Sequence, residues 1–454
     1  NRFSRTLEPR DFSRGRFRGG FLMGEMGLHE ATRLIQDIIS DPKCDIMEPD
    51  QLQSVLRLAE KGMPGYNKKV VDIIATTMAK YGITVVDMDT RDSAEEIYKY
   101  LWGMDIIEDL YHLPHVDEIR VNGPRHVYYQ EKGKSKQYHD ATFKDNEHIR
   151  KIVNRLLGEQ KAVDVSNPGC VCKTLDGTRL TVLDSPLTTN PSIAMRKHGT
   201  FNISDENYVE SGTMNEKIQE MLSILIKGRS NILVCGDSNV GKTTLIRWGV
   251  KYLQPKLRII TVEINAELSL GEWYPDRDIV AIESHPELGW DMKKCFRTVL
   301  ILSPDVIIVG EARGEGEASQ MINACRSGHH GTMGTIHVYS AQEAVSTLAT
   351  MAMEEGRKLP IGLLENQVAS AFNIIIQMYG NSITGVKKIE KIVEVWKGKN
   401  GPEFQELCVW VPSDDDFEKG HWEFPNDISD NLSSKLFRFG VAKKEIAKIK
   451  SGLQ

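Results

Sequence analysis

The residues that decide the fold of this chain are Ile232-Leu233-Val234-Cys235-Gly236-Asp237-Ser238-Asn239-Val240-Gly241-Lys242-Thr243-Thr244. A short apolar run ends there in the pattern G-x-x-x-x-G-K-T. A helical pattern from Leu245 to Leu253 follows directly and is closed by Pro255. A strand, then this loop, then a helix is the context in which the pattern forms a phosphate-binding loop. The alternative is a glycine-containing surface turn that matches by chance, and the strand and helix on either side argue against it.

The loop pattern predicts a nucleotide site for a physical reason. Gly236 and Gly241 allow the backbone to curl until successive N–H groups point at one spot, and the N-terminus of the following helix adds partial positive charge there. We expect Lys242 to reach the β- and γ-phosphates of ATP and the Thr243 hydroxyl to bind Mg²⁺. The predicted nucleotide-binding residues of the loop are Gly236, Asp237, Ser238, Asn239, Val240, Gly241, Lys242, Thr243 and Thr244.

Length and composition limit the class of protein. A chain of 454 residues predicts two or three domains, and its net charge of -6 argues against a protein that coats nucleic acid non-specifically. The seven cysteines are widely spread without any C-x-x-C, which fits reduced thiols in a cytosol. No stretch approaches the ~20 apolar residues of a membrane span, and the N-terminus lacks the apolar region of a signal peptide. We therefore expect a soluble, cytoplasmic protein.

Changes of pattern along the chain predict six segments. Residues 1–24 carry arginines among Gly, Ser and Phe, which predicts a disordered basic tail, either solvated or bound to acidic lipid or a partner. These arginines are Arg2, Arg5, Arg10, Arg14, Arg16 and Arg18. Residues 25–111 are predicted as a helical N-terminal module, 112–200 as an α/β domain and 201–213 as a polar linker. Residues 214–412 are predicted as the nucleotide-binding domain, and 413–454 as a C-terminal tail with a solvated helix.

The nucleotide-binding segment alternates strands with helices, so the predicted fold class is α/β. The expected strands are Ile232–Cys235, Leu257–Val262, Val306–Val309, Gly334–His337 and Asn373–Met378. The unbroken apolar run Val306–Val309 indicates a parallel sheet covered on both faces. Residues 389–395 and 404–411 alternate around a Gly-rich turn and predict a hairpin. Thr213-x-x-Glu216 predicts a capping box that opens a helix ending at Gly228.

Acidic residues at two strand ends predict hydrolytic chemistry. Glu311 follows the buried run Val306–Val309, which is the Walker B arrangement, and its carboxylate is expected to hold Mg²⁺ or orient the attacking water. The aspartate common at this place is replaced by Gly310, so Glu311 acts alone or with another acid. The alternative is a surface glutamate after a core strand. Glu263 and Glu267 end the strand that follows the loop helix, and one of them is a candidate base.

Histidines cluster in the segment Gly328-His329-His330-Gly331, and a further histidine, His337, ends the next strand. With Cys325 they suggest a zinc site, but the carboxylate or thiolate pairs of a closed site are missing. His329 and His337 have the position expected of residues that sense phosphate.

Four motifs in order resemble the secretion-superfamily ATPases of type II and type IV secretion and pilus machines. They are the phosphate loop (Walker A), T-x-E-x-x-x-E-L from Thr261, P-D-x-I-x-x-G-E-x-R from Pro304 and G-H-x-G-x-x-x-T-x-H from Gly328. Upstream, Glu118-Ile119-x-Val121-Asn122-Gly123-Pro124, Glu131-Lys132-Gly133-Lys134, Leu175-Asp176-Gly177-Thr178-Arg179 and Ile193-x-x-Arg196-Lys197 are similar to the tight-adherence pilus branch. The resemblance covers about residues 110–412.

The resemblance implies a hexameric ring at the cytoplasmic face of a membrane, with inner-membrane platform proteins as partners. It implies that ATP and Mg²⁺ bind between an N-terminal α/β domain and a RecA-like domain, and that hydrolysis rocks these domains to drive pilus assembly or secretion. The catalytic residues that it implies are Glu263, Glu267, Glu311, His329 and His337. Thr243 and Glu311 would hold the metal, and Arg179 and Arg196 would approach the phosphates.

The sequence departs from the family pattern at several places. Ile264 follows Glu263 where an aspartate is usual, and Ile301, Ser303 and Thr347 stand where the family has arginines. An arginine at a phosphate contributes about 10³–10⁵ in rate, so nucleotide binding is expected more firmly than fast turnover.

Two other functions therefore stay open. One is a nucleotide-binding structural ring whose hydrolysis is impaired. The other is a nucleic-acid translocase, against which the acidic net charge and the absence of a basic channel with aromatic residues argue. Direct binding of nucleic acid is not expected.

Overall fold

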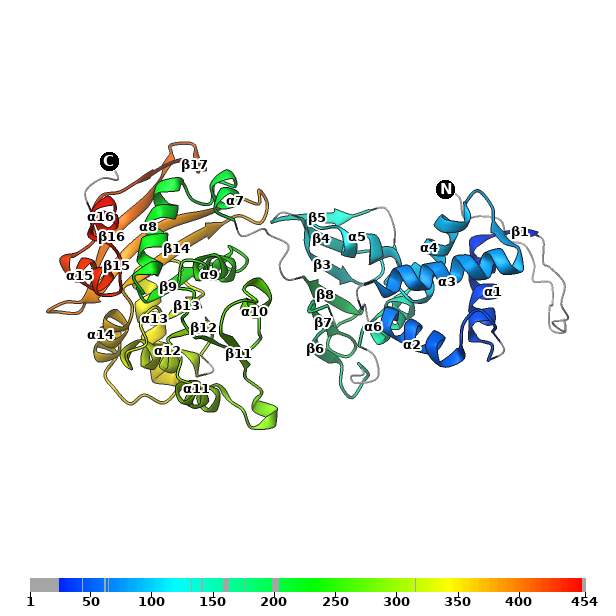
Figure 1. Ribbon diagram of the computed structural model, residues 1–454, viewed down its shortest axis with the longest axis horizontal. Helices are drawn as coiled ribbons and strands as arrows, with labels where there is room; N and C mark the ends of the chain where they lie inside the picture. The colour runs from blue at the N-terminus through cyan, green and yellow to red at the C-terminus, as the bar shows by residue number, and fades with distance from the viewer. Residues whose placement is uncertain are drawn as a thin grey trace. The chain divides into compact units, whose positions relative to one another are not determined.

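A computed structural model describes residues 24–450 except 43, 61, 62, 64, 132, 140, 141, 158–162, 175, 198–203 and 315. The chain forms two compact units (Figure 1). Apart from residues 132–135, the first unit is built from residues up to 200 and the second from 201 onward. The predicted basic tail lies outside the described residues except for Gly24. The six predicted segments are finer than this division, and their boundaries stay predictions.

The first unit begins with helices packed around one apolar cluster. Their bounds are α1 (Leu28–Ser40), α2 (Pro49–Glu60), α3 (Tyr66–Tyr81) and α4 (Thr90–Leu101), with β1 (Gly24–Met26) paired in parallel to β2 (Ile83–Val85). Apolar residues at helical spacing, such as Ala31, Ile35 and Ile38 of α1, fill the cluster. Among the described residues, every helix is too short or too polar to pass through a bilayer.

A six-stranded antiparallel sheet follows in the same unit, in the order β5-β4-β3-β8-β7-β6. The bounds are β3 (Val116–Asn122), β4 (Val127–Glu131), β5 (Lys134–Tyr138), β6 (Gly169–Lys173), β7 (Arg179–Leu183) and β8 (Ser192–Arg196). The short helix α5 (Glu108–His112) precedes it, and α6 (Asn146–Leu157) packs Ile149 and Ile152 against Ile119 and Leu180. The turn predicted at Gly123 is confirmed, since Asn122 N–H donates to His126 O at 2.8 Å.

The second unit is organised by a nine-stranded sheet in the order β11-β10-β12-β13-β9-β14-β15-β16-β17. The strands are β9 (Ile232–Gly236), β10 (Ile259–Glu263), β11 (Ile279–Glu283), β12 (Val306–Ala312), β13 (Met333–Ile336), β14 (Ile374–Gly380), β15 (Lys387–Lys397), β16 (Pro402–Ser413) and β17 (Asp416–Glu423). Strands β9 to β14 pair in parallel, and β15 to β17 are antiparallel additions. The predicted parallel sheet, its five strands and the hairpin are confirmed. The half-buried edge strand β11 was not predicted.

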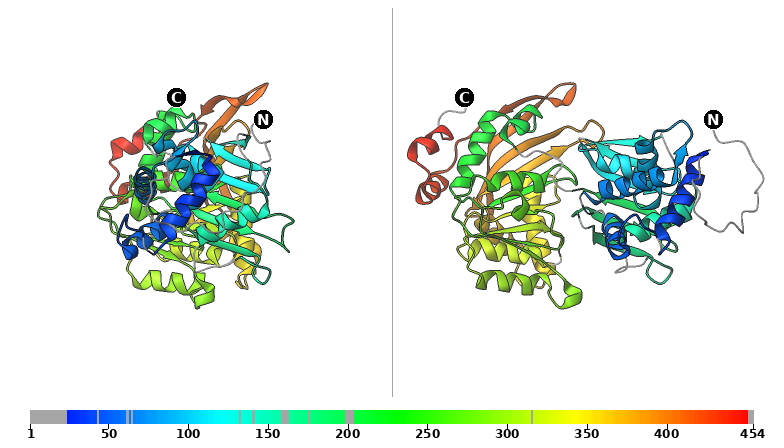
Figure 2. Two further views of the ribbon diagram at one scale, coloured as in Figure 1. Left: turned by 90° about the vertical axis from the view of Figure 1, so that its right-hand side faces the viewer. Right: turned by 45° about the vertical axis from the view of Figure 1, so that its right-hand side comes forward.

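Helices cover both faces of this sheet, as the sequence predicted (Figure 2). Ile232 and Val234 of β9 face one apolar cluster, and the alternate residues Leu233 and Cys235 face the other. The first cluster contains α8 (Glu216–Lys227), α9 (Lys242–Val250), α15 (Asp430–Arg438) and α16 (Lys443–Lys448). The second contains α11 (Met292–Ile301), α12 (Glu317–Arg326), α13 (Ala341–Glu354) and α14 (Ile361–Ala371).

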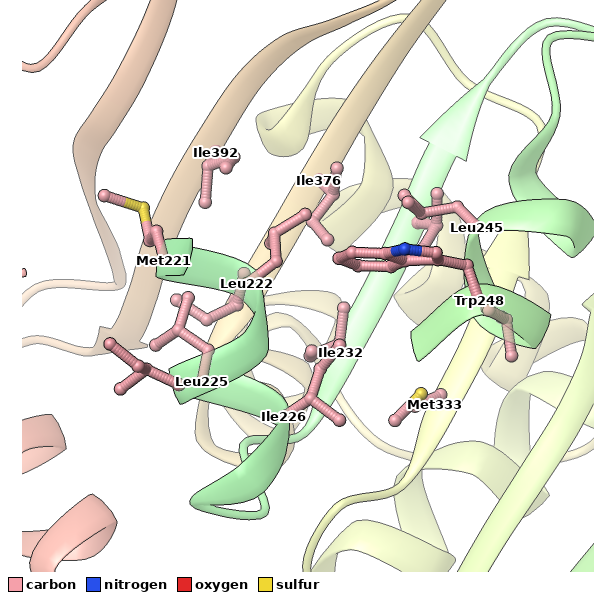
Figure 3. Packing of buried hydrophobic residues seen from close by; sticks show 14 of the residues in the cluster. Met221, Leu222, Leu225, Ile226, Ile232, Leu245, Trp248, Met333, Ile376 and Ile392 are labelled. Atoms are coloured by element: carbon pink, nitrogen blue, oxygen red, sulfur yellow. The ribbon is translucent and has the colours of Figure 1, made fainter. Parts of the chain in front are cut away.

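Figure 3 shows how α9 is held against the sheet. Trp248 and Leu245 of α9 lie beside Ile226 and Leu222 of α8, and all four point towards Ile232 and the neighbouring strands. Trp248 is fully buried. Since α9 begins at the phosphate-loop lysine, this packing fixes the helix that carries the loop.

The segment predicted as a polar linker contains a helix, α7 (Asp205–Glu210), in its described part. The Asp205 carboxylate accepts hydrogen bonds from Trp248 Nε1 at 2.8 Å, in the last turn of α9, and from Tyr252 OH at 2.6 Å, just after that helix. The predicted capping box at Thr213 is wrong, because Asn215 Oδ1 accepts from Ile218 N–H at 2.9 Å and so caps α8. Gly228 ends α8 as predicted.

The C-terminal segment is not the solvated tail that the sequence suggested. Strand β17 extends the sheet, and α15, α16 and the residues just after each helix bury apolar side chains in the first cluster. These buried residues are Leu432, Leu436, Val441, Ile446 and Ile449. In the sequence these residues form only short apolar repeats between charged residues. They are buried because they pack against α8, which is distant in the chain. Leu436, for example, packs directly on Gly228.

Replacing Leu436 by Ala is expected to destabilise the second unit by about 2–5 kcal/mol, because a fully buried side chain leaves a cavity between α15 and α8. Urea denaturation followed by tryptophan fluorescence measures the loss. Phe437→Ala is the matched control, since the neighbouring side chain is 54% exposed. Equal midpoints for the two variants would show that α15 does not pack as described.

Candidate functional site

The phosphate-loop sequence adopts a backbone that requires its glycines. Gly236 ends β9 with φ 142°, and a Cβ atom there would lie 2.4 Å from the carbonyl oxygen of Met378 on β14. Gly241 has φ 101° and Asn239 has φ 64°, so the chain turns sharply twice before α9 begins at Lys242. The first N–H groups of a helix have no partner within it and are free to bind an anion. The predicted order of strand, loop and helix is confirmed.

Lys242 is held over this loop although it is a buried cation. The residue is 5% exposed, and its Nζ donates to the carbonyl oxygens of Gly236 at 2.8 Å and Asp237 at 2.7 Å. The same Nζ lies 3.1 Å from Nδ1 of His337, the residue that follows β13. Because β13 pairs in parallel with β9, the carboxyl ends of both strands meet at the loop. The ammonium therefore sits at the place where phosphates would lie.

Glu311 is the acid of β12, and it is ionised. His337 Nε2 contacts Glu311 Oε1, and Arg313 Nε donates to Glu311 Oε2 at 2.5 Å. Burial by itself raises the pKa of Glu311, but the hydrogen bond from His337 and the charge of Arg313 outweigh it and lower the pKa to about 2. The carboxylate is thus linked through His337 to Lys242.

Glu263 is the last residue of β10, and its pKa is shifted in the opposite direction from that of Glu311. It is 3% exposed, and its Oε2 accepts the N–H groups of Glu267 at 2.8 Å and Leu268 at 3.0 Å. Its Oε1 is buried and has no hydrogen-bond partner within the described residues. Burial raises the pKa of Glu263 to about 7, although the two N–H groups oppose the shift. A carboxylate that titrates near neutral pH with one free oxygen is suited to accept a proton.

Glu263 and Glu311 line one pocket in the second unit. Its lining residues are Thr243, Glu263, Ile264, Asn265, Glu267, Gly310, Glu311 and Arg313. The pocket also explains the missing aspartate before Glu311. A Cβ atom at Gly310 would lie 2.7 Å from Cγ of Glu263, so the Glu263 side chain occupies the space that a larger residue would need.

The residues present fit a nucleoside triphosphate with Mg²⁺. The loop offers backbone N–H groups and Lys242, and the pocket offers the Thr243 hydroxyl and carboxylate oxygens, which are the ligands that Mg²⁺ prefers. The buried, unpaired Oε1 of Glu263 is a polar atom that a bound water would satisfy.

The alternative of a zinc site gains no support from the geometry. Within the described residues, no group of three or more His, Cys, Asp or Glu side chains is arranged to hold a metal alone. Burial raises the pKa of the Cys325 thiol to about 12, which disfavours the thiolate that zinc requires.

The structure does not bring His329 to this pocket. His329 precedes β13, and its Nδ1 lies 3.1 Å from the carbonyl oxygen of Pro304, which precedes β12. Because β12 and β13 are parallel, both positions lie at the amino ends of these strands, whereas Glu311 lies near the carboxyl end of β12. His329 and His337 are separated by the whole length of β13, so they lie at opposite ends of that strand. The catalytic role of His329 stays a prediction.

Arg179 and Arg196 lie in the first unit. They are register partners on β7 and β8, with Arg196 exposed and Arg179 partly buried. Their approach to the phosphates stays a prediction.

Arg313 lines the pocket but was not singled out from the sequence, although the motif G-E-x-R contained it. Arg247, in the interior of α9, gave no signal in the sequence at all. Its guanidinium reaches the loop that carries Glu267.

Comparison with known proteins gives the family. The model of the family described as type II/IV secretion system protein matches residues 103–389. An uncharacterized protein of Methanocaldococcus jannaschii is 24% identical over 343 residues, which cover 72% of this chain and 60% of that protein. The type IV secretion system protein PtlH of Bordetella pertussis is 30% identical over 188 residues, or 39% of this chain and 52% of that protein.

Among solved structures, the pilus retraction motor PilT with bound ADP aligns at 16% identity and a TM-score of 0.45, covering 76% of this chain and 90% of that chain. The chain spans about half to three-fifths of the length of the first curated relatives that it matches. Membership of the tight-adherence branch stays a prediction. Because the matched residues 103–389 make up more than half of its length and contain the whole site described above, this chain belongs to the type II/IV secretion system protein family.

Proposed function

We propose that this protein is an ATPase motor that hydrolyses Mg-ATP in the pocket beside the Gly236–Thr244 loop. The observation that carries the proposal is Glu263, a buried carboxylate with a pKa of about 7 and one unpaired oxygen. It lines the same pocket as Thr243 and the ionised Glu311. A base beside a phosphate loop, together with a hydroxyl and a carboxylate that can hold Mg²⁺, supplies the parts that phosphoryl transfer to water needs.

Each side chain has a defined task in this proposal. Lys242 exchanges its bonds to the carbonyls of Gly236 and Asp237 for bonds to phosphate oxygens. Thr243 and Glu311 would hold Mg²⁺, which would neutralise charge on the phosphates. Glu263 Oε1 takes the proton of the attacking water, and general-base catalysis of this kind contributes about 10²–10⁴ in rate. His337 lies between Lys242 and Glu311 and links the two.

We extend the proposal from the site to the machine on the strength of the family. The motor acts as a hexameric ring at the cytoplasmic face of a membrane and powers pilus assembly or protein secretion, with inner-membrane platform proteins as partners. The relative PtlH is a type IV secretion system protein, and the aligned PilT is a pilus retraction motor. That Arg179 and Arg196 approach the phosphates, as the family resemblance implies, is part of this proposal.

A second candidate, a ring that binds ATP and hydrolyses it poorly, is favoured by one surface feature. Ile301 stands where the family has an arginine, and its apolar side chain is 80% exposed at the end of α11. A cation is thus missing from the surface of the second unit, and an arginine supplied to a phosphate contributes about 10³–10⁵ in rate. Binding without turnover in the assembled ring would select this candidate.

Replacing Glu311 by Gln tests the proposed hydrolysis. We expect turnover at saturating Mg-ATP to fall by about 10²–10³-fold, because the variant loses a charged ligand of the Mg²⁺ that would neutralise charge on the phosphates. Phosphate release measures the effect. The matched control is Glu287→Gln, which changes a similar His–Glu pair (His285–Glu287, 2.9 Å) on the exposed surface. Equal turnover in the two variants would contradict the role of Glu311.

A further inference from the structure

Arg247 is a buried cation on the phosphate-loop helix α9, one and a half turns after Lys242. It is 6% exposed, and among the described residues its guanidinium donates to backbone carbonyls, not to a carboxylate. Burial lowers the pKa of its guanidinium, which is nevertheless charged at any physiological pH. Keeping a charge inside a domain is costly, so the hydrogen bonds that it makes must matter.

The guanidinium donates to two successive carbonyl groups of the loop after β10. Nε donates to Leu268 O at 2.8 Å, and Nη2 donates to Glu267 O. The N–H groups of the same two residues donate to Glu263 Oε2 at 2.8 and 3.0 Å. Arg247 and Glu263 thus hold the same two residues of the loop from opposite sides.

One peptide group connects the two side chains directly. The carbonyl of Glu267 and the N–H of Leu268 belong to a single planar unit. Its oxygen accepts from Arg247, and its N–H donates to Glu263. A charged donor polarises a peptide group and strengthens the bond that the group donates at its other end. The phosphate-loop helix is therefore linked to the carboxylate through one hydrogen-bonded relay.

Further contacts fix this arrangement. The loop from Ile264 to Ser269 has no helix or strand of its own and leads into α10 (Leu270–Trp273). Tyr274 OH donates to the carbonyl of Arg247 at 2.6 Å, and the Trp273 ring lies 5.8 Å from the guanidinium carbon. Arg247 thus contacts both the loop, at Glu267 and Leu268, and the residues at the end of α10.

We propose that Arg247 is a positioning residue for Glu263. Through the backbone of Glu267 and Leu268, Arg247 fixes the position of the Glu263 carboxylate relative to the phosphate loop. The inference rests on the function proposed above, since it assigns the base of that reaction a support. Arg247 touches neither nucleotide nor water in this account. Its effect belongs to the chemical step and not to nucleotide affinity.

The test compares Arg247→Gln and Arg247→Lys with Arg277→Gln. Arg277 is a matched control because its Nη2 also donates to two carbonyls, Lys251 O at 3.1 Å and Leu253 O at 3.0 Å, which follow the end of α9 that is remote from the phosphate loop. We expect Arg247→Gln to lower kcat by about 10- to 100-fold, as misplacing a catalytic group by about 1 Å does. The dissociation constant for ATP should change less than threefold. Arg247→Lys keeps the charge without the two-pronged donor and should fall between Arg247→Gln and the native protein.

A second readout does not depend on hydrolysis. Amide hydrogen exchange at Glu267 and Leu268 should accelerate at least tenfold in Arg247→Gln, and should not change in Arg277→Gln. A native kcat in Arg247→Gln, or an equal loss of kcat and affinity, would overturn the inference while leaving the ATPase intact. If the native protein hydrolyses no ATP, the proposed function fails, and unaltered exchange at Leu268 would then overturn the positioning role separately. Should Arg247→Gln fail to fold, the same criteria apply to Arg247→Lys.

Discussion

Replacing Glu263 by Gln is expected to lower ATP turnover by about 10²–10⁴-fold, because the amide cannot take a proton from water. Nucleotide affinity should stay near its native value, since Glu263 binds no part of the loop at residues 236–244. In the native protein, turnover should rise as the pH increases through about 7, where Glu263 loses its proton. Phosphate release measured between pH 5.5 and 8.5 gives both the loss of turnover in Glu263→Gln and the rise of native turnover with pH.

Stability provides an independent readout for the same substitution. The pKa of Glu263 is about 7 in the folded protein, against 4.5 for an ordinary glutamate. Between these values the folded state keeps a proton that the unfolded chain releases, so stability falls as the pH rises and the loss is complete above about pH 7. The loss is of order 3 kcal/mol. Glu263→Gln carries no such proton, and it should therefore be more stable than the native protein at pH 8.

The matched control is Glu283→Gln on the neighbouring strand β11. Glu283 is the register partner of Glu263, and its Oε1 accepts the N–H of Ala266 in the same loop at 3.0 Å, but it is only partly buried. We expect near-native turnover and no gain of stability at pH 8 for this variant. If Glu263→Gln keeps native turnover, or if both variants lose it equally, Glu263 is not the base.

Lys242→Ala is expected to weaken ATP binding by about 100-fold or more. A hydrogen bond to a charged group contributes about 1.5–3 kcal/mol, and 1.4 kcal/mol corresponds to a tenfold change. Lys242 is placed to make such bonds with two phosphates. The fold should survive, because the carbonyls of Gly236 and Asp237 border the loop and can bind water instead.

Equilibrium titration with a fluorescent ATP analogue measures this loss. Lys256→Ala serves as the control, since Lys256 is an exposed lysine just beyond α9 in the same unit. Native affinity in Lys242→Ala would place the nucleotide elsewhere on the protein.

The parts of the site that the sequence could predict are those that one short segment specifies. The phosphate loop is such a case, because Gly236 and Gly241 occupy backbone conformations that other residues rarely adopt. The parallel strands were also predictable, since runs such as Val306–Val309 are buried on both faces. The acids Glu263 and Glu311 could be placed because the carboxyl ends of parallel strands meet at one edge.

The parts that the sequence could not predict depend on contacts between distant segments. The pKa of Glu263 is about 7 and that of Glu311 about 2, because Glu311 is paired with Arg313, two residues away, and with His337 at the end of another strand. The contact with His337 could not be read from the local sequence. His329 lies away from the pocket because the motif that contains it and His337 spans the whole of β13. The role of Arg247 depends on a loop that lies 20 residues further along the chain.

The packing of the C-terminal helices was missed for a related reason. Their short apolar repeats, such as Leu432 and Leu436, are buried only because they pack against α8, which lies more than two hundred residues earlier in the chain. A solvated helix and a packed helix of this length have similar sequences when the partner surface is not known.

The structure of this protein bound to Mg²⁺ and a slowly hydrolysed ATP analogue tests the central claim most directly. We predict that Lys242 Nζ leaves the carbonyls of Gly236 and Asp237 and lies about 2.7–2.9 Å from phosphate oxygens. Glu263 Oε1 should then face a water beside the terminal phosphate. A nucleotide bound away from the loop, or a terminal phosphate with Glu263 turned away from it, would contradict the account.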